Sequence, residues 1–174
     1  MSAPSLTQQP CPSAALLARA RIVAESVVDP EMPDITLGDM GLVRDVRAAP
    51  ADEGIEIVIT PSFIGCPATD IIAIEIMHAL AKAGIDAVRI TRALSPPWTS
   101  DWITDAGREK LRVAGIAPPP PRGLSFEAAL ESPVACPRCG SPHTERQSQF
   151  GSSPCKARFT CLACAEPFEQ MKPV

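Results

Sequence analysis

Four cysteines in the last part of the chain are the residues whose type and spacing most clearly predict a chemical role. They form two C-x-x-C pairs, Cys136 with Cys139 and Cys161 with Cys164. A gap of two residues lets both thiolates of a pair reach one ion, and two such pairs build the tetrahedral cage of a structural zinc ribbon. Two disulfides are an alternative, and four thiolates also bind iron or an iron–sulfur cluster. The spacing therefore predicts a metal site, with zinc as the expected ion.

Cys66 is a second candidate, because it lies in T-P-S-F-I-G-C-P, where a predicted strand gives way to a predicted helix. Proline is favoured at the first helical position, which predicts Pro67 there and Cys66 as the N-cap residue. A thiol at a helix N-terminus faces free N–H groups that favour its thiolate form. Transient metal binding or thiol exchange would use that thiolate. The alternative is an inert, buried cysteine that packs as a small hydrophobic residue.

The acidic loop D-P-E-M-P-D at residues 29–34 is a third candidate. Its two prolines restrict the backbone, so the carboxylates of Asp29 and Glu31 could be held in fixed positions. Carboxylate oxygens suit Fe²⁺, whereas a thiolate suits softer ions. If the loop folds over Cys66, the two together offer a mixed oxygen and sulfur site for transient iron or an iron–sulfur cluster. The alternative is a solvated turn, for which Asp and Pro are typical.

The remaining cysteines and histidines give weaker signals. Cys155 has the same strand parity as Cys161, which predicts that both point to one face and that Cys155 is a spare thiol near the cage. Cys11 is expected to be incidental. His143 would replace a thiolate only if a cysteine were displaced, and His78 is expected to be structural. With two histidines in the chain, a histidine-based active site is not expected, which argues against an enzyme that acts alone.

Composition narrows the classes of protein to consider. The 174 residues contain seven cysteines, and the N-terminus lacks the basic and apolar regions of a signal peptide, which favours a reducing cytoplasm. No apolar run approaches the roughly 20 residues of a membrane span. The net charge is −4, aromatic residues make up 4% and tyrosine is absent. Neither a membrane nor a nucleic acid is therefore an expected partner.

The spacing of apolar residues predicts an α+β fold for the larger part of the chain. The expected elements are a helix at 13–28, a loop at 30–41, strands at 42–48 and 55–60, a helix at 67–83, a strand at 86–91 and a helix at 101–114. Ser100 is predicted to cap the last of these helices. A short sheet sandwiched with helices is the expected architecture.

A run of four prolines within residues 117–123 predicts a semi-rigid linker. The chain is therefore expected to consist of a disordered leader at 1–12, the α+β domain at 13–116, this linker at 117–123 and a ribbon at 124–174. Short strands are expected in the ribbon at 144–150, 156–161 and 167–172. About forty residues cannot build a sufficient core alone, so the ion is expected to supply folding free energy on the order of 10 kcal/mol.

Several of these segments resemble known families. V-V-D-P-E-M-P-D-I and T-P-S-F-I-G-C-P-A-T-D resemble the family of small iron–sulfur cluster assembly domains. L-S-P-P-W-T-S-D-W-I-T-D-A-G-R-E-K-L, C-P-R-C-G-S and F-G-S-S-P-C-K-A-R-F-T-C-L-A-C extend the similarity to the D-subunit family (PaaD) of multicomponent phenylacetyl-CoA epoxidases, which act in aerobic phenylacetate degradation. Asp29, Pro30, Glu31 and Cys66 match the assembly motif, and the four paired cysteines match the ribbon.

The resemblance implies an accessory role. Oxygenase and reductase are separate subunits in that system, so this chain would help to mature or maintain an iron or iron–sulfur centre of the other epoxidase subunits, its clients. A purely structural subunit and a thiol-redox protein that uses Cys66 are the alternatives. The sequence also leaves open whether the chain forms a homodimer.

Overall fold

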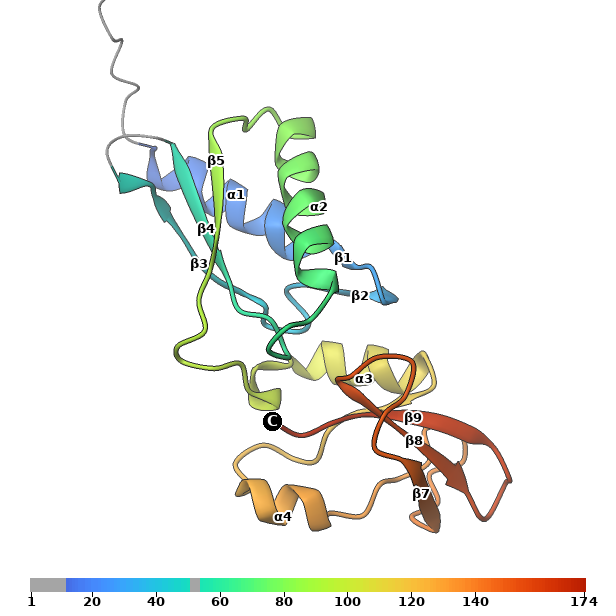
Figure 1. Cartoon of the computed structure of the whole chain (residues 1–174). Helices are drawn as coiled ribbons and strands as arrows, with labels where there is room; N and C mark the ends of the chain where they lie inside the picture. Colours follow the sequence, from blue (N-terminus) through green and yellow to red (C-terminus); the bar gives the residue numbers. More distant parts are fainter. Residues whose placement is uncertain (1–11, 51–53) are drawn as a thin grey trace, which may run out of the picture.

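The computed structural model describes residues 12–50 and 54–174, and it confirms the predicted α+β fold class. The predicted leader falls almost wholly outside these residues, as do residues 51–53 between the first two predicted strands. Figure 1 shows a sheet accompanied by two helices in the upper half and a second sheet in the lower half. Helix α3 (Asp105–Val113) lies between the two halves.

A three-stranded sheet organises the first half, with β3 (Val43–Ala48), β4 (Ile55–Ile59) and β5 (Val88–Arg92) in the order β3-β4-β5. β3 and β4 pair antiparallel, whereas β4 and β5 pair parallel. All five residues of the central strand β4 are buried. Its one charged side chain, Glu56, is paired with Arg47 at 2.7 Å and Arg89 at 2.8 Å, which compensates a carboxylate in a buried strand.

Two helices cover this sheet. In α1 (Ala14–Ser26), the Ser13 hydroxyl accepts a hydrogen bond from the Leu16 N–H and so caps the helix, and α2 (Ala68–Lys82) makes the crossover from β4 to β5. Both helices place small or branched apolar residues against the strands: Ala20, Ala24, Ile72, Ile76 and Leu80. α2 therefore fixes the chain immediately after Cys66.

The predicted loop at 30–41 is wrong in part, because it contains a short hairpin. β1 (Val28–Asp29) pairs antiparallel with β2 (Met32–Thr36), and α1 ends earlier than predicted to make room for β1. Met32 and Ile35 are buried and anchor the hairpin in the core. Proline usually argues against a β-strand, so the two prolines of D-P-E-M-P-D led to the prediction of a loop.

The predicted helix at 101–114 also differs. A 3-10 turn covers Ser100–Trp102, and α3 begins only after Thr104, whose hydroxyl accepts from the Gly107 N–H at 2.9 Å. Ile103 is fully buried between the two and holds the chain extended. Ser100 is therefore not the cap of this helix, which contradicts the prediction.

A four-stranded sheet organises the second half, in the order β6-β9-β8-β7. Its strands are β6 (Ile116–Ala117), β7 (Thr144–Ser148), β8 (Lys156–Cys161) and β9 (Pro167–Met171), and α4 (Phe126–Glu131) precedes β7. β6 pairs parallel with β9 although it precedes the proline run. The predicted boundary after residue 116 thus lies inside a strand of the ribbon sheet, and the division into domains stays a prediction.

Residues of both halves contribute to the larger hydrophobic cluster of the chain. Cys155 and Met171 of the second half belong to the same buried cluster as the residues of α1, α2 and β4, and Met171 is completely buried. The Arg108 guanidinium donates to the carbonyls of Pro119 and Pro120 at 2.8 and 3.0 Å, which holds the proline run against α3. The linker is therefore packed against the first half along part of its length.

An ion pair ties α3 to the end of β2. Asp39 accepts from Lys110 Nζ at 2.6 Å and from the N–H and hydroxyl of Thr36 at 2.9 Å. Burial of Asp39 opposes its ionisation, but Lys110 and Thr36 outweigh that effect and lower the pKa of the carboxyl below its ordinary value of 3.8. The paired carboxylate therefore stabilises the fold fully at pH values above 3.8. This stabilisation is lost as the pH falls through the lowered pKa.

We expect Asp39→Asn to reduce the free energy of unfolding at pH 7 by about 1 kcal/mol, a modest value because Lys110 is partly exposed to solvent. The deficit relative to the native protein should vanish once the carboxyl is protonated in both states, at pH values below its lowered pKa. Denaturant titrations at several pH values would measure it. A deficit that persists unchanged in acid would contradict the ion-pair explanation.

Among residues 12–50 and 54–174, none of the helices is both long enough and apolar enough to cross a bilayer.

Candidate functional site

The structure gathers the four paired cysteines at one end of the ribbon sheet. Their sulfur atoms all lie within 4.8 Å of one another, with 3.8 Å between Cys136 and Cys164 and 3.6 Å between Cys139 and Cys161. Four sulfurs bonded at about 2.3 Å to a central ion form a tetrahedron with edges of about 3.8 Å. The donor set and its dimensions therefore fit a tetrahedral thiolate-bound cation such as zinc.

Tight turns present these thiols. The Gly140 N–H donates to the Cys136 carbonyl at 2.9 Å, and Gly140 takes a positive φ of 74° that glycine adopts without strain. In the second pair, the backbone N–H groups of Cys164 and Ala163 favour the Cys161 thiolate and lower the pKa of that thiol to about 7. Each knuckle is thus a compact turn, and the second one aims backbone donors at sulfur, as a bound thiolate requires.

The thiols also compete with one another for protons. The Glu166 N–H favours the Cys164 thiolate, but desolvation and the neighbouring thiols outweigh it and raise the pKa of Cys164 to about 12. A divalent cation would replace the protons that the cluster shares. His143 is exposed beyond the cluster, so the cage has four sulfur donors without it.

Cys66 lies at the other candidate site, and its predicted position is off by one residue. α2 begins at Ala68 with Pro67 as the N-cap residue, so Cys66 precedes the cap. The Cys66 carbonyl accepts from the N–H of Thr69 at 3.2 Å and from its hydroxyl at 2.8 Å. Pro67 has a helical backbone conformation, but it is the N-cap residue and not, as predicted, the first residue of the helix.

The acidic loop does fold over Cys66. Asp29, Glu31 and Cys66 line one small cavity of about 20 Å³, at the place where β1, β2 and the loop before α2 meet. Asp29 is buried, and desolvation raises the pKa of its carboxyl even though its Oδ1 accepts from the Glu31 N–H at 2.8 Å. Cys66 and the two acidic residues thus line one cavity, and their joint role as a mixed oxygen and sulfur site stays a prediction.

Cys155 lines the same cavity, which the parity argument did not foresee. It precedes β8, is buried in the core of the first half, and does not join Cys161 at the four-cysteine cluster. Its sulfur lies 3.1 Å from the Ser153 hydroxyl, and burial raises the pKa of the Cys155 thiol. One signal was present in the sequence, since Cys155 stands outside both C-x-x-C pairs. Cys66, which lines the same cavity, lies far away along the chain.

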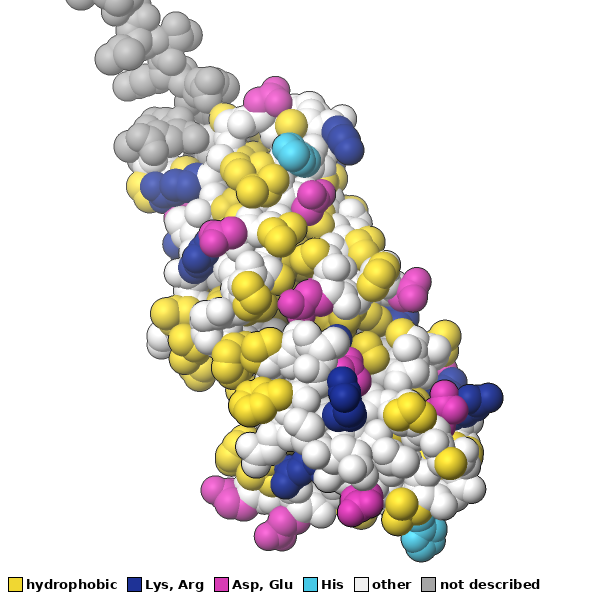
Figure 2. Space-filling model, turned by 45° about the vertical axis from the view of Figure 1, so that its right-hand side comes forward, with side chains coloured by type: hydrophobic (Ala, Val, Ile, Leu, Met, Phe, Trp, Pro, Cys, Tyr) yellow, Lys and Arg dark blue, Asp and Glu magenta, His cyan; other side chains and the backbone are white. Residues whose placement is uncertain are grey.

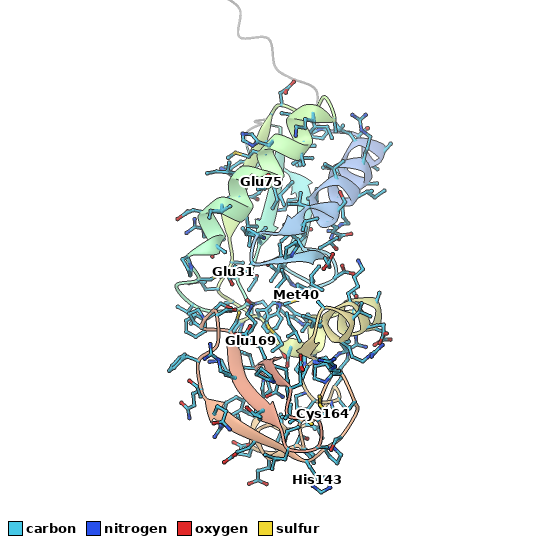
Figure 3. All side chains as sticks on the ribbon, turned by 90° about the vertical axis from the view of Figure 1, so that its right-hand side faces the viewer. Glu31, Met40, Glu75, His143, Cys164 and Glu169 are labelled. Atoms are coloured by element: carbon cyan, nitrogen blue, oxygen red, sulfur yellow. The ribbon has the colours of Figure 1, made fainter. Side chains whose placement is uncertain are left out.

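The two sites are spatially separate. Figure 3 shows Glu31 and Glu169 at the junction of the two halves, whereas Cys164 and His143 lie farther down in the ribbon. Glu169 accepts from the buried Lys156 at 3.3 Å at this junction. One site is thus enclosed by the ribbon alone, and the other is built from both halves.

A mainly apolar groove opens beside the cavity. It has a volume of about 820 Å³ and shares Thr60, Pro61, Ser62 and Cys155 with the cavity. Its exposed apolar side chains come from both halves: Phe63, Ile64, Leu94, Phe126 and Leu130. Figure 2 shows hydrophobic side chains gathered along the junction of the halves. The cavity is therefore bordered by a surface on which a second molecule could rest.

Two family models match different parts of the chain. Residues 120–172 match the family described as the PaaD zinc beta ribbon domain, and residues 21–91 match the family described as iron–sulfur cluster assembly protein. A protein of Escherichia coli (strain K12), named as the D component of 1,2-phenylacetyl-CoA epoxidase, is 44% identical over 146 residues, covering 84% of this chain and 86% of that protein. The resemblance seen in the sequence is thereby confirmed.

Two further relatives cover less of the chain. The Fe-S protein maturation auxiliary factor YitW of Bacillus subtilis (strain 168) is 35% identical over 91 residues, 51% of this chain and 86% of that protein. A solved domain of unknown function from Bacillus anthracis, DUF59, superposes with a TM-score of 0.50 over 56% of this chain and 92% of its own, at 24% identity. The solved domain supports the α+β fold.

Proposed function

The chain belongs to the family of 1,2-phenylacetyl-CoA epoxidase D subunits, and from this premise we propose that it matures or maintains an iron or iron–sulfur centre of such an epoxidase. In this proposal the cavity with Cys66, Asp29 and Glu31 holds iron or a cluster as cargo, and another epoxidase subunit is the client. The observation that carries the proposal is the convergence of a thiol and two carboxyl groups on one cavity.

The chemistry of the cavity suits cargo that must leave again. A thiolate and carboxylates bind Fe²⁺, whose softness lies between that of the ions each donor prefers. The name of the Bacillus subtilis relative, an Fe-S protein maturation auxiliary factor, supports the same role for this part of the chain. The apolar groove would give the client a contact surface next to Cys66.

The four-cysteine cluster has a different role in this proposal. Zinc held by four thiolates has no open coordination position, so it serves structure and not catalysis. Cys136, Cys139, Cys161 and Cys164 would hold it, and the folded ribbon would help to dock the client. The chain itself then needs no catalytic residue, because the oxygenation belongs to the other subunits.

The test is epoxidase activity in cells that lack the native protein but make all other subunits. We expect Cys66→Ser to reduce conversion of phenylacetyl-CoA to the level of cells without the protein, because the cargo loses its thiolate. The Cys11→Ser variant, which removes a cysteine that belongs to neither sequence motif, serves as the matched control and should restore full activity.

A purely structural role predicts a different pattern. In that case Cys66→Ser would support normal activity, while loss of a ribbon cysteine would abolish it. Normal activity with Cys66→Ser, at normal protein abundance, would therefore refute the maturation role. If Cys66→Ser instead abolishes activity, the iron content of the purified oxygenase and reductase would identify the client that relies on this chain.

A further inference from the structure

We propose that Cys155 supplies a second thiolate beside Cys66, so that the two halves of the chain jointly bind one Fe²⁺ ion at their junction. This inference rests on the proposed function and adds a ligand that neither the C-x-x-C pattern nor the assembly motif contains. It also makes the ribbon a part of the cargo site and not only its support.

The position of Cys155 is fixed by the ribbon backbone. Its carbonyl accepts from the Lys172 N–H at 3.0 Å, and the Lys156 N–H donates to the Ser153 carbonyl at 3.1 Å in the turn that contains it. This turn inserts the Cys155 side chain into the core of the first half, where Cys66 packs against the same cluster. The two cysteines therefore line one cavity from opposite halves of the chain.

The cavity has the size and the donors of a site for one ion. Its volume of about 20 Å³ is close to the space that one water molecule occupies. Thr60, Ser62 and Thr69 line the cavity together with the two cysteines, Asp29 and Glu31. A cation bound there would have two sulfur donors and nearby oxygen donors.

The surrounding charges favour a cation. Asp29, Glu31 and Glu169 place three carboxyl groups at the junction, against the single buried ammonium of Lys156. Lys156 is paired with Glu169 at 3.3 Å, so its charge is already compensated. The Asp29 and Glu31 carboxylates then remain to balance the charge of a divalent ion.

The arrangement is looser than the four-cysteine cluster, as a cargo site should be. Within the described parts of the chain, only that cluster has three or more metal-binding side chains with donor atoms inside 4.8 Å of one another. The junction site thus offers a pair of thiols with carboxyl groups that must move closer to the ion. A site of this kind, unlike the closed four-thiolate cage, would keep coordination positions open for other ligands.

The experiment uses the full chain with zinc already in the ribbon, titrated with Fe²⁺ under anaerobic conditions. Iron-edge X-ray absorption counts the sulfur atoms on iron without interference from zinc, and we expect two sulfurs in the native protein. Loss of a residue that merely supports a metal ligand costs roughly 10- to 100-fold in affinity, so Cys155→Ser and Cys66→Ser should each weaken Fe²⁺ binding at least as much. Cys11→Ser should bind as the native protein does.

The outcomes separate this inference from the proposed function. One sulfur on iron in the native protein, or native Fe²⁺ affinity in Cys155→Ser, overturns the second thiolate. No bound iron beyond the ribbon site overturns it as well. The maturation role is tested separately by the activity of Cys66→Ser in cells. It can therefore remain valid even if Cys155 proves not to bind iron. Because the absorption measurement uses the native chain, a folding defect of a variant does not obscure the result.

Discussion

Replacement of Cys161 with serine is expected to abolish metal binding in the ribbon and to unfold it. The buried cluster of the ribbon contains only Ala117, Cys136, Ala157, Phe159, Cys161 and Phe168 among the described residues, so two of its six members are cysteines of the cage. Such a core cannot stabilise its own fold, and a structural zinc ion contributes on the order of 10 kcal/mol near neutral pH. Most of that contribution would be lost.

Elemental analysis and circular dichroism would measure this effect. We expect the purified native chain to contain one zinc per chain and the Cys161→Ser variant to contain none, with loss of the ribbon's strand signal. His143→Ala is the matched control, because His143 follows the first pair but is exposed and outside the cage. It should retain the zinc and the fold. A Cys161→Ser variant that keeps both would contradict the tetrathiolate cage.

The second large effect concerns Met171, which lies in the ribbon but packs in the core of the first half. Met171 is fully buried there, and truncation of such a side chain to alanine leaves a cavity that costs about 2–5 kcal/mol. We therefore expect Met171→Ala to destabilise the first half of the chain, although the substitution is near the C-terminal end of β9. If the proline run were a free spacer, the stability of the first half would not change on this substitution.

Tryptophan fluorescence during denaturant unfolding would measure this, since Trp98 is buried in that core and both tryptophans lie before the proline run. The control is Met77→Ala, which removes an equal side chain from an exposed position of α2 and should change the free energy of unfolding by no more than about 0.5 kcal/mol. A fluorescence transition that is the same for Met171→Ala and the native chain would show that the halves fold independently.

Together the two experiments address how the halves depend on each other. Loss of the ribbon metal should also lower the stability of the first half, because Cys155 and Met171 leave its core when the ribbon unfolds. A maturation factor built in this way would present its cargo site only when the ribbon is folded. The cargo site and the ribbon metal are then linked through packing and not through a shared ligand.

Local sequence signals determined much of the fold. The hairpin of β3 and β4, the helices α1 and α2 and the strands of the ribbon follow from periodicity and turn residues within each segment. The four-cysteine cluster was equally accessible, because two knuckles with a fixed gap impose nearly the same geometry wherever they occur. The family resemblance was confirmed for the same reason: its motifs are contiguous stretches of sequence.

The tertiary structure decided what depends on distant residues. β1 and β2 form because Met32 and Ile35 find a core, which outweighs the prolines beside them. Strand parity relates Cys155 to Cys161 only along one strand, whereas packing against the first half turns Cys155 toward Cys66. Lys110 of α3 is likewise fixed by the carboxylate of Asp39, which lies far away in sequence. The free energy of such contacts comes from burial that neither segment achieves alone, so no local pattern encodes it.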